Sequence, residues 1–319
     1  MKKFLLKVCL FTFPLIILAY ALDIFISENL KKAQVFMEGE IGVWEDIYNQ
    51  RVNSDVLIYG SSRAYVHINP IQIQDSLQVS CYNFGVNGQN FRIQYLRHLE
   101  YMEHNPKPKT IIVSVDIFSL QKVANLFNYR QFLPYLDKEN VQKYTSAYNG
   151  FNTFDYYLPL VKYYGEHDAV KRAFAKFDEE PPHQQFRLRG YHPVARDWNT
   201  DFSKAKTKKL SYTLEIDASV QQLFEEFLTD CQEKNIQVIL VYTPIYKEGQ
   251  QYVENHENIV SYYQKLANDL HIPFLNYLEH DICANRDYFY NSTHLNKKGS
   301  ILFTNILIQD LKAKNIILK

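Results

Sequence analysis

The chain has 319 residues, of which 46% are hydrophobic and 22% charged, and its formal net charge at pH 7 is zero. This is the composition of a globular protein, long enough for one large domain or two smaller ones. Neither the net charge nor any basic run suggests nucleic-acid binding, so no nucleic-acid partner is predicted.

The N-terminal segment differs from the rest of the chain. It begins with a basic stretch and continues into an apolar run, residues 8–22, that is free of charge and ends before Asp23. If Lys7 and Asp23 snorkel, the run reaches about the length that spans a bilayer. Bulky side chains favour an uncleaved anchor over the alternative, a signal peptide cleaved near Ala19-Tyr20-Ala21. The preceding lysines predict a cytoplasmic N-terminus and an extracytoplasmic remainder, periplasmic or at the cell surface.

The cysteines give no sign of a metal site. Cys9 lies in the apolar run, and Cys81, Cys231 and Cys283 are scattered without the spacing of metal ligands. We interpret them as small core residues or, at most, one disulfide. No metal and no other cofactor is predicted.

Beyond residue 30, short apolar strands alternate with helical segments. Residues 24–36 are expected to continue the N-terminal helix. Apolar strands separated by helices predict an α/β fold in which a parallel sheet is covered on both faces, a doubly wound sandwich. Strands are predicted at residues 56–59, 79–84, 110–115, 236–242 and 272–275, and helices at residues 90–104, 219–234, 254–270 and 297–312.

One interval breaks this alternation. Residues of about 120–210 are crowded with tyrosine and phenylalanine and also hold several arginines. We therefore predict an anchor over residues 1–30 and a domain over residues 31–319 that carries this interval as an insertion. The aromatic side chains either form the insertion's own core or form a cap that holds a sugar polymer or an acyl donor.

Two short segments suggest chemistry. Gly60-Ser61-Ser62 ends the first predicted strand, which puts a hydroxyl at the carboxyl edge of the sheet, where open α/β sheets bind ligands. His294 lies just before the last predicted helix. A serine and a histidine brought together by the fold suggest a nucleophile and its base. The alternatives are that Ser62 caps a helix and that His294 is a polar residue beginning one.

These motifs resemble those of the SGNH (GDSL-type) hydrolase superfamily. Gly60-Ser61-Ser62, the segment Asn83-Phe84-Gly85-Val86-Asn87-Gly88 and Asn291-Ser292-Thr293-His294 follow the order of that family's motifs. The resemblance covers residues 56–311 and implies a three-layer, flavodoxin-like fold with an esterase or acyl-transfer site. It is closest in style to single-pass, membrane-anchored members that modify cell-envelope polymers alongside membrane-bound O-acyltransferases.

The resemblance implies roles for individual residues. Ser62 is similar to the family's nucleophile and His294 to its general base, while the N–H groups of Gly88 and Ser62 would hold the oxyanion. Asn291 stands where the family has an aspartate, so it would orient His294 without negative charge. In a serine-protease triad the same exchange costs about ten-thousand-fold in rate. Asp287, or a Ser-His dyad, is the alternative.

A second departure concerns the third strand. Val115-Asp116-Ile117-Phe118 replaces the family's Gly-x-Asn-Asp, whose asparagine is an oxyanion donor. A missing donor costs about a hundred- to thousand-fold unless Asn87 or the insertion supplies one. Arg63 either binds a carboxylate or phosphate of the substrate, faces solvent, or pairs with Asp116. His67 is expected to be a surface or half-buried polar residue.

The export segment and the resemblance together predict a membrane-anchored, extracytoplasmic serine esterase or O-acyltransferase. Its substrate would be an acyl group, acetyl first, on a cell-envelope glycan, and a membrane-bound O-acyltransferase is a possible partner. The alternative is a catalytically silent SGNH-like scaffold that binds a glycan or a membrane acyltransferase. The asparagine at position 291 and the missing Gly-x-Asn-Asp motivate this alternative.

Overall fold

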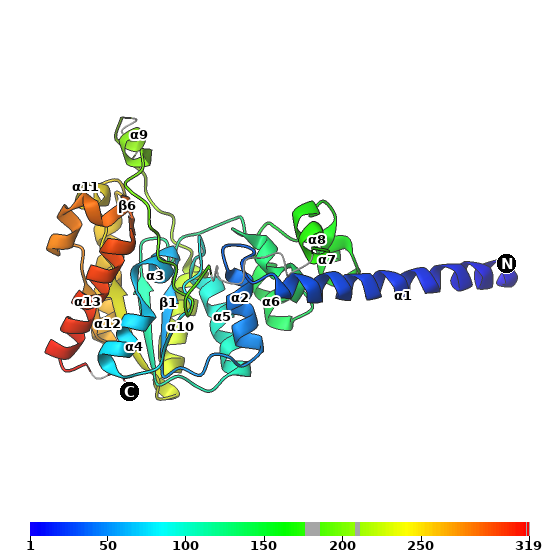
Figure 1. The fold of residues 1–319 in the computed structure, drawn as a ribbon, viewed down its shortest axis with the longest axis horizontal. Helices are drawn as coiled ribbons and strands as arrows, with labels where there is room; N and C mark the ends of the chain where they lie inside the picture. The colour runs from blue at the N-terminus through cyan, green and yellow to red at the C-terminus, as the bar shows by residue number, and fades with distance from the viewer. Residues whose placement is uncertain (176–185, 208–210, 317, 319) are drawn as a thin grey trace. The chain divides into compact units, whose positions relative to one another are not determined.

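The computed structural model describes residues 1–175, 186–207, 211–316 and 318. The chain forms two compact units. One combines Met1–Glu45 with Ala124–Phe186, and the other combines Asp46–Val123 with Arg187–Lys319. The predicted insertion of about 120–210 is therefore divided between the two units. Its later part, from Arg187 onward, belongs to the unit that contains the sheet (Figure 1).

The sheet of the second unit has five strands in the order β2-β1-β3-β4-β5. All four pairings are parallel, and Ile58 lies between Asn83 on one neighbour and Ile112 on the other. This is the strand order of flavodoxin-like folds, which confirms the predicted α/β sandwich. The strands are β1 (Val56–Gly60), β2 (Cys81–Asn83), β3 (Thr110–Val115), β4 (Gln237–Tyr242) and β5 (Phe274–Asn276).

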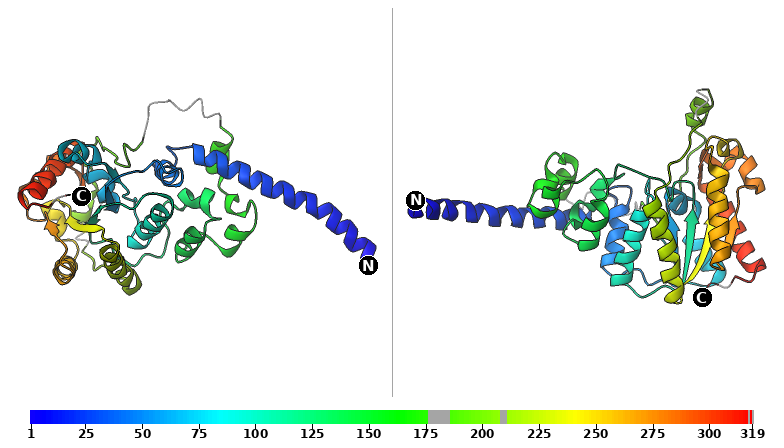
Figure 2. Two further views of the ribbon diagram at one scale, coloured as in Figure 1. Left: turned by 90° about the horizontal axis from the view of Figure 1, so that it is seen from below. Right: turned by 180° about the vertical axis from the view of Figure 1, so that it is seen from behind.

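Helices cover both faces of this sheet (Figure 2). Ile58 and Ile112 pack against Phe303 and Leu307 of α13 on one face. Because strand side chains alternate, Tyr59 points to the other face, where its ring centroid lies 6.1 Å from that of Phe227 on α10. The first face is covered by α3 (Ser62–His67), α4 (Pro70–Leu77) and α13 (Lys297–Ala313), the second by α5 (Phe91–His104), α10 (Ala218–Glu233) and α12 (His256–Asp269).

A small antiparallel hairpin stands apart from the main sheet. It pairs β6 (Phe289–Asn291) with β7 (His294–Leu295) just before α13, and it was not predicted. The hairpin is too short and too polar to show the periodicity of a strand, yet it carries His294. The remaining elements of this unit are α9 (Asp201–Thr207), α11 (Lys247–Gln250), η4 (Asp281–Ala284) and η5 (Arg286–Tyr288).

The cysteines are all unpaired, and Cys81, Cys231 and Cys283 are buried. Burial raises the pKa of both the Cys231 and the Cys283 thiol to about 12, so these groups stay protonated at neutral pH. The interpretation of these three cysteines as core residues is confirmed, and the single disulfide is excluded.

The other unit is built around aromatic side chains. Trp44 is fully buried, its ring centroid lies 5.7 Å from that of Phe132, and its Nε1 donates to Gln131 Oε1 at 3.1 Å. Within this unit, much of the aromatic interval therefore serves as a core. Its elements are α1 (Lys2–Lys32), η1 (Tyr129–Tyr135), α6 (Glu139–Thr145), α7 (Thr153–Tyr157), η2 (Val161–Tyr163) and α8 (His167–Ala173), with α2 (Glu40–Tyr48) at the boundary between the units.

Helix α1 has the length and composition of a membrane span. It runs for 31 residues, and its large apolar side chains are exposed from Phe4 to Phe25. Asp23 does not snorkel: its carboxylate binds Lys162 Nζ at 3.0 Å and accepts the Leu160 N–H at 2.7 Å. The predicted continuation of the helix holds as far as Lys32. A single N-terminal apolar helix of this kind fits a membrane anchor or a signal sequence.

Two buried histidines make stability depend on pH. His98 bonds to the Tyr59 hydroxyl at 3.0 Å and His256 to the Tyr242 hydroxyl at 2.8 Å, and burial lowers the pKa of each to about 4. The unfolded chain, with histidine pKa values of about 6.5, binds more protons below that pH. Stability present above pH 6.5 is therefore lost progressively as the pH falls toward 4.

We expect the free energy of unfolding to drop by roughly 1–2 kcal/mol for each of these histidines between pH 7 and pH 5. Urea denaturation of the full chain in detergent micelles measures it. The double variant His98→Gln/His256→Gln keeps polar partners for both tyrosines and should show a flatter pH dependence. An equally steep fall in the double variant would contradict the assignment.

Candidate active site

The site begins at the tight turn after β1. Gly60 has φ of +146°, and a Cβ at this position would lie 2.7 Å from the carbonyl oxygen of Ser114 on β3. Only glycine fits this close approach. The next residue, Ser61, caps α3: its Oγ accepts the Arg63 N–H at 3.3 Å and donates to the Asp116 carboxylate. The helix cap is thus Ser61, and the alternative that Ser62 serves as the cap is wrong.

The structure brings Ser62 and His294 into contact. Ser62 Oγ lies 2.8 Å from His294 Nε2, although the two residues are 232 positions apart. Asn291 Oδ1 lies 3.0 Å from His294 Nδ1 and also accepts the His294 backbone N–H at 2.9 Å, which identifies this atom as the amide oxygen. An acceptor facing Nδ1 favours the tautomer with its proton on Nδ1. Nε2 is then free to accept the Ser62 proton, the arrangement of a nucleophile with its base.

Two neighbours of His294 escaped the sequence interpretation. Thr293 Oγ1 lies 3.0 Å from His294 Nδ1 and 3.3 Å from Asn291 Oδ1, so it joins the hydrogen bonds that orient the ring. The Tyr290 ring stacks on the imidazole with centroids 5.3 Å apart and an interplanar angle of 14°. Both residues lie in or beside the short hairpin, whose formation no periodicity signalled.

His67 was also misjudged. Instead of lying at the surface, it is fully buried. Its Nε2 accepts the backbone N–H of Leu295 at 3.0 Å, so its Nδ1 donates to Thr243 Oγ1 at 3.0 Å. Burial lowers the pKa of His67 well below its usual range and keeps the ring neutral. Since Ser62 and His67 share α3, this imidazole ties the helix of Ser62 to the strand of His294.

Arg63 is not placed to meet a substrate. Its side chain is only 1% exposed, and Nε contacts the buried Asp116 carboxylate at 3.3 Å. The predicted alternative, pairing with Asp116, is what the structure has. Asp116 also accepts the Phe118 N–H at 2.7 Å, and the guanidinium lies over the Tyr242 ring at 5.3 Å. The aspartate after β3 therefore holds the β1–α3 turn from inside the protein.

The surroundings of His294 keep its imidazole neutral. Burial and, second, the nearby Arg63 charge lower the pKa of His294 to about 3. Behind its Nδ1 stand Asn291 and Thr293, whereas Asp287 is exposed and does not take the place of the family's acid. The imidazole can accept a proton, but the imidazolium gains no support from a carboxylate.

The loop after β2 lies against α3, the helix that carries Ser62. Asn83 Nδ2 donates to the carbonyl oxygens of Ala64 and Ile68 at 2.9 and 2.8 Å, and a Cβ on Gly85 would lie 2.5 Å from the Tyr65 nitrogen. This loop carries the predicted oxyanion donors, with Asn87 half-buried and Gly88 exposed.

The predicted oxyanion donors come from two places, the Ser62 N–H at the start of α3 and the loop after β2. No hydrogen-bond acceptor among the described residues contacts the Ser62 N–H, and its role as an oxyanion donor stays a prediction. The roles of Gly88 and Asn87 as oxyanion donors stay predictions.

Comparisons with known proteins give distant likenesses. No protein-family model matches the chain, and no curated protein does. The fold is similar to the crystal structure of an acetyl xylan esterase, with a TM-score of 0.39 and 14% identity over 80% of this chain and 99% of that one. It is also similar to a GDSL-like lipase from Bacteroides thetaiotaomicron, with a TM-score of 0.35 and 12% identity over 81% and 88%. With TM-scores below 0.5, these likenesses carry no inference about activity.

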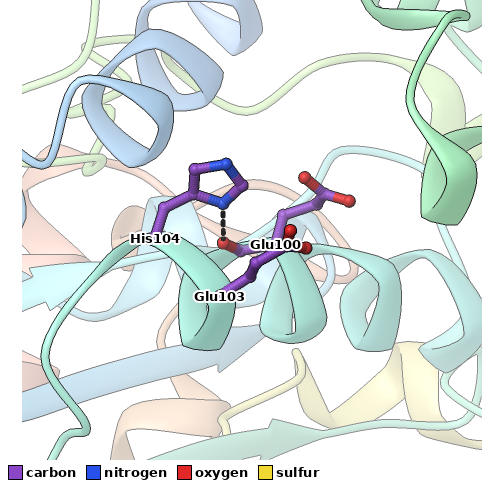
Figure 3. A group of neighbouring side chains, drawn as sticks. All are labelled: Glu100, Glu103 and His104. Carbon is purple, nitrogen blue, oxygen red and sulfur yellow. Dashed lines mark hydrogen bonds between the residues drawn. The ribbon is translucent and has the colours of Figure 1, made fainter.

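A possible metal-ligating group lies elsewhere, on α5. Glu100, Glu103 and His104 place one ligand atom each within 4.8 Å of one another (Figure 3). His104 Nδ1 hydrogen-bonds the Glu100 carbonyl oxygen at 2.9 Å, so only Nε2 remains for a ligand. All three residues come from one helix, on the face of the sheet opposite to α3. This group is therefore separate from Ser62, which lies on α3.

The buried Asp116–Arg63 pair should be needed for the stability of the fold. Asp116→Asn leaves the buried guanidinium without its counter-charge, which in buried pairs costs about 3–5 kcal/mol. We expect a loss of this order in urea denaturation of the full chain. Asp75→Asn, at an exposed position on α4, is the matched control and should change stability by less than about 0.5 kcal/mol. Equal effects of the two variants would rule out the anchoring role.

Replacing the neutral Asn291 by aspartate should change the rate of ester hydrolysis and the pH dependence of kcat/KM. Asn291→Asp keeps every hydrogen bond that Oδ1 accepts and adds the missing negative charge. We expect ester hydrolysis to accelerate by at least about tenfold, since the reverse exchange costs a serine protease about ten-thousand-fold. The acid limb of kcat/KM, set near pH 3 by the lowered pKa of His294, should move toward neutral pH.

Asn291→Ala is the matched control for this prediction. It removes the acceptor that fixes the imidazole and should slow hydrolysis further. A variant with aspartate that hydrolyses no faster than the native chain, while remaining folded, would show that the rest of the site is incompetent.

Proposed function

We propose that this chain is an SGNH-type serine hydrolase, an esterase or O-acyltransferase. The observation that carries the proposal is the 2.8 Å contact between Ser62 Oγ and His294 Nε2, with Asn291 behind the imidazole. The contact lies at the carboxyl edge of a parallel sheet, where this fold class places ligands. The freedom of Ser62 from helix capping supports the same conclusion.

The mechanism follows from this geometry. Ser62 Oγ attacks the acyl carbonyl carbon while its proton passes to His294 Nε2. The oxyanion that forms accepts the Ser62 N–H, with the Gly88 N–H as the second proposed donor. Collapse of the tetrahedral intermediate breaks the ester C–O bond, and the leaving alcohol takes the proton from Nε2. Water, or an acceptor hydroxyl in the transferase, then attacks the acyl-serine and restores Ser62 with His294 as base.

Asn291 sets the expected pace of this reaction. Each proton transfer passes through an imidazolium that has no carboxylate beside it, and the pKa of His294 is only about 3. A base of such low pKa accepts a proton weakly at neutral pH. We therefore propose a slow esterase, or one whose rate rises when a partner supplies the missing negative charge.

The cellular setting is part of the proposal. The lysines that precede the apolar run of α1 favour insertion with the enzyme domain on the extracytoplasmic side. In that setting the substrate would be an acyl group, acetyl first, on a cell-envelope glycan. A membrane-bound O-acyltransferase would be the source of the acyl group if the chain acts as a transferase.

A second candidate is a silent scaffold that binds a glycan or an acyltransferase. Two observations favour it: Asn291 gives no charge to His294, and Asp116 is consumed in the core where the family has an oxyanion donor nearby. In that case Ser62→Ala would fully restore the phenotype of a deletion strain.

Labelling of the serine tests the proposal. The full chain in detergent micelles is treated with a fluorophosphonate probe and assayed with p-nitrophenyl acetate. We expect a covalent adduct on Ser62, lost in Ser62→Ala and retained in Ser76→Ala, an exposed serine on α4. Absence of the adduct in a chain whose circular dichroism shows an intact fold would remove the enzyme and leave the scaffold.

A further inference from the structure

An open groove of about 1020 Å³ lies beside the hairpin that carries His294. Phe289 of β6 and Asn296, two residues after His294, form part of its wall. The rest comes from the segment 195–203, from η5 and from the start of α13, so three separate stretches of chain converge on it. Figure 1 shows α9, β6 and α13 in this part of the unit. We call this feature the basic groove.

The basic groove carries an excess of positive charge. Its cations are Arg196, Arg286, Lys297 and Lys298, against two carboxylates, Asp197 and Asp287. In the described part of the chain, no salt bridge within 4.0 Å neutralises any of the four cations. The whole protein has zero net charge, so this excess is local.

Aromatic rings hold two of these cations in place. The Arg286 guanidinium lies over the Trp198 ring at 5.6 Å, and Lys298 Nζ lies over the Tyr288 ring at 5.2 Å. Trp198 is itself fixed by an edge contact with Tyr246, with centroids 4.9 Å apart. Cation–π contacts order a cation without cancelling its charge, so an external anion still meets the full charge.

The placement of the lysines is unfavourable for the fold alone. Lys297 and Lys298 occupy the first turn of α13, a 17-residue helix, where the helix dipole is positive. The cap is already satisfied, because Asn296 Oδ1 accepts the Gly299 N–H at 2.9 Å. Cations at this end slightly destabilise the helix, whereas a bound anion would interact favourably with both lysines and with the helix dipole.

We propose that the basic groove binds an acidic stretch of the glycan whose ester is presented to Ser62. The spread of the cations over an open groove fits several carboxylates or phosphodiesters along one chain better than a single small anion. The half-buried Trp198 ring adds apolar surface of the kind that sugar rings pack against. The substrate is then an acidic acylated polymer. This last step rests on the proposed esterase function, whereas anion binding by the groove does not.

Binding is tested without catalysis. The Ser62→Ala chain in detergent micelles is titrated calorimetrically with polygalacturonate oligosaccharides, a phosphodiester-linked glycerol polymer, and neutral xylan oligosaccharides of equal length. We expect an acidic polymer to bind at 50 mM salt, to weaken at 300 mM salt, and to bind more tightly than the neutral one. The carboxylate and phosphodiester arms identify which anion the groove prefers.

Charge reversal locates the binding site. Arg196→Glu/Lys297→Glu, on the Ser62→Ala background, should weaken binding of the acidic polymer by at least about tenfold. Lys265→Glu/Lys312→Glu, at exposed helical positions of the same unit that do not line the groove, is the matched control and should leave affinity unchanged. Thermal unfolding of both variants shows whether the fold is retained.

Equal affinity for neutral and acidic polymers, or unchanged binding after reversal in the groove of a folded chain, would overturn the proposal. The esterase proposal and the proposal of anion binding by the basic groove can be disproved independently of each other. Loss of fluorophosphonate labelling with charge-dependent binding intact removes the esterase and leaves the groove, whereas labelling without such binding removes the groove alone.

Discussion

The buried pair of Asp116 and Arg63 is the interaction on which the site depends. The carboxylate at the end of β3 receives the Ser61 hydroxyl and the Arg63 guanidinium, both from the turn after β1. This fixes the start of α3 and gives the capping role to Ser61. The hydroxyl of Ser62, one residue later, is thereby left free to meet His294.

The same constraint explains a departure from the family's pattern. Asp116 stands at the end of the third strand, in the segment where the resemblance places an asparagine as oxyanion donor, and it is here a structural anchor. Its position could be predicted from the sequence because Thr110–Val115 is an unambiguous buried strand. Its partners could not, since the pairing of Asp116 with Ser61 and Arg63 depends on how closely β1 and β3 approach at Gly60.

The elements that could be predicted from the sequence are those with strong local sequence patterns. The buried strands β1, β3 and β4 carry β-branched residues and four of the flanking helices are long, so their patterns indicated the α/β sandwich. The strands β2 and β5 span three residues each, and the short helices α3 and α4 were not predicted. The pairing of Ser62 with His294 followed from their places at the sheet edge and before α13. The β6–β7 hairpin, the burial of His67 and the cap at Ser61 rest on contacts between distant segments, which no local pattern carries. For the same reason the sequence left three alternatives open for Arg63.

The site combines firm positioning with weak electrostatics. His67, Thr293 and Asn291 fix the imidazole and its hairpin by hydrogen bonds, yet none of them is charged. Geometry and charge are therefore separable in this protein. The contact between Ser62 and His294 is thus maintained by neutral hydrogen-bonding groups.

The contacts of Asp23 determine how the first unit would be held at a membrane. Helix α1 runs without a break from its exposed apolar part to Lys32, and Asp23 is bonded within the unit that contains Lys162. If α1 spans a membrane, that unit begins where the span ends, with no tether between them. The residues around Lys162 would then be held at the bilayer surface by the helix itself rather than by a flexible linker.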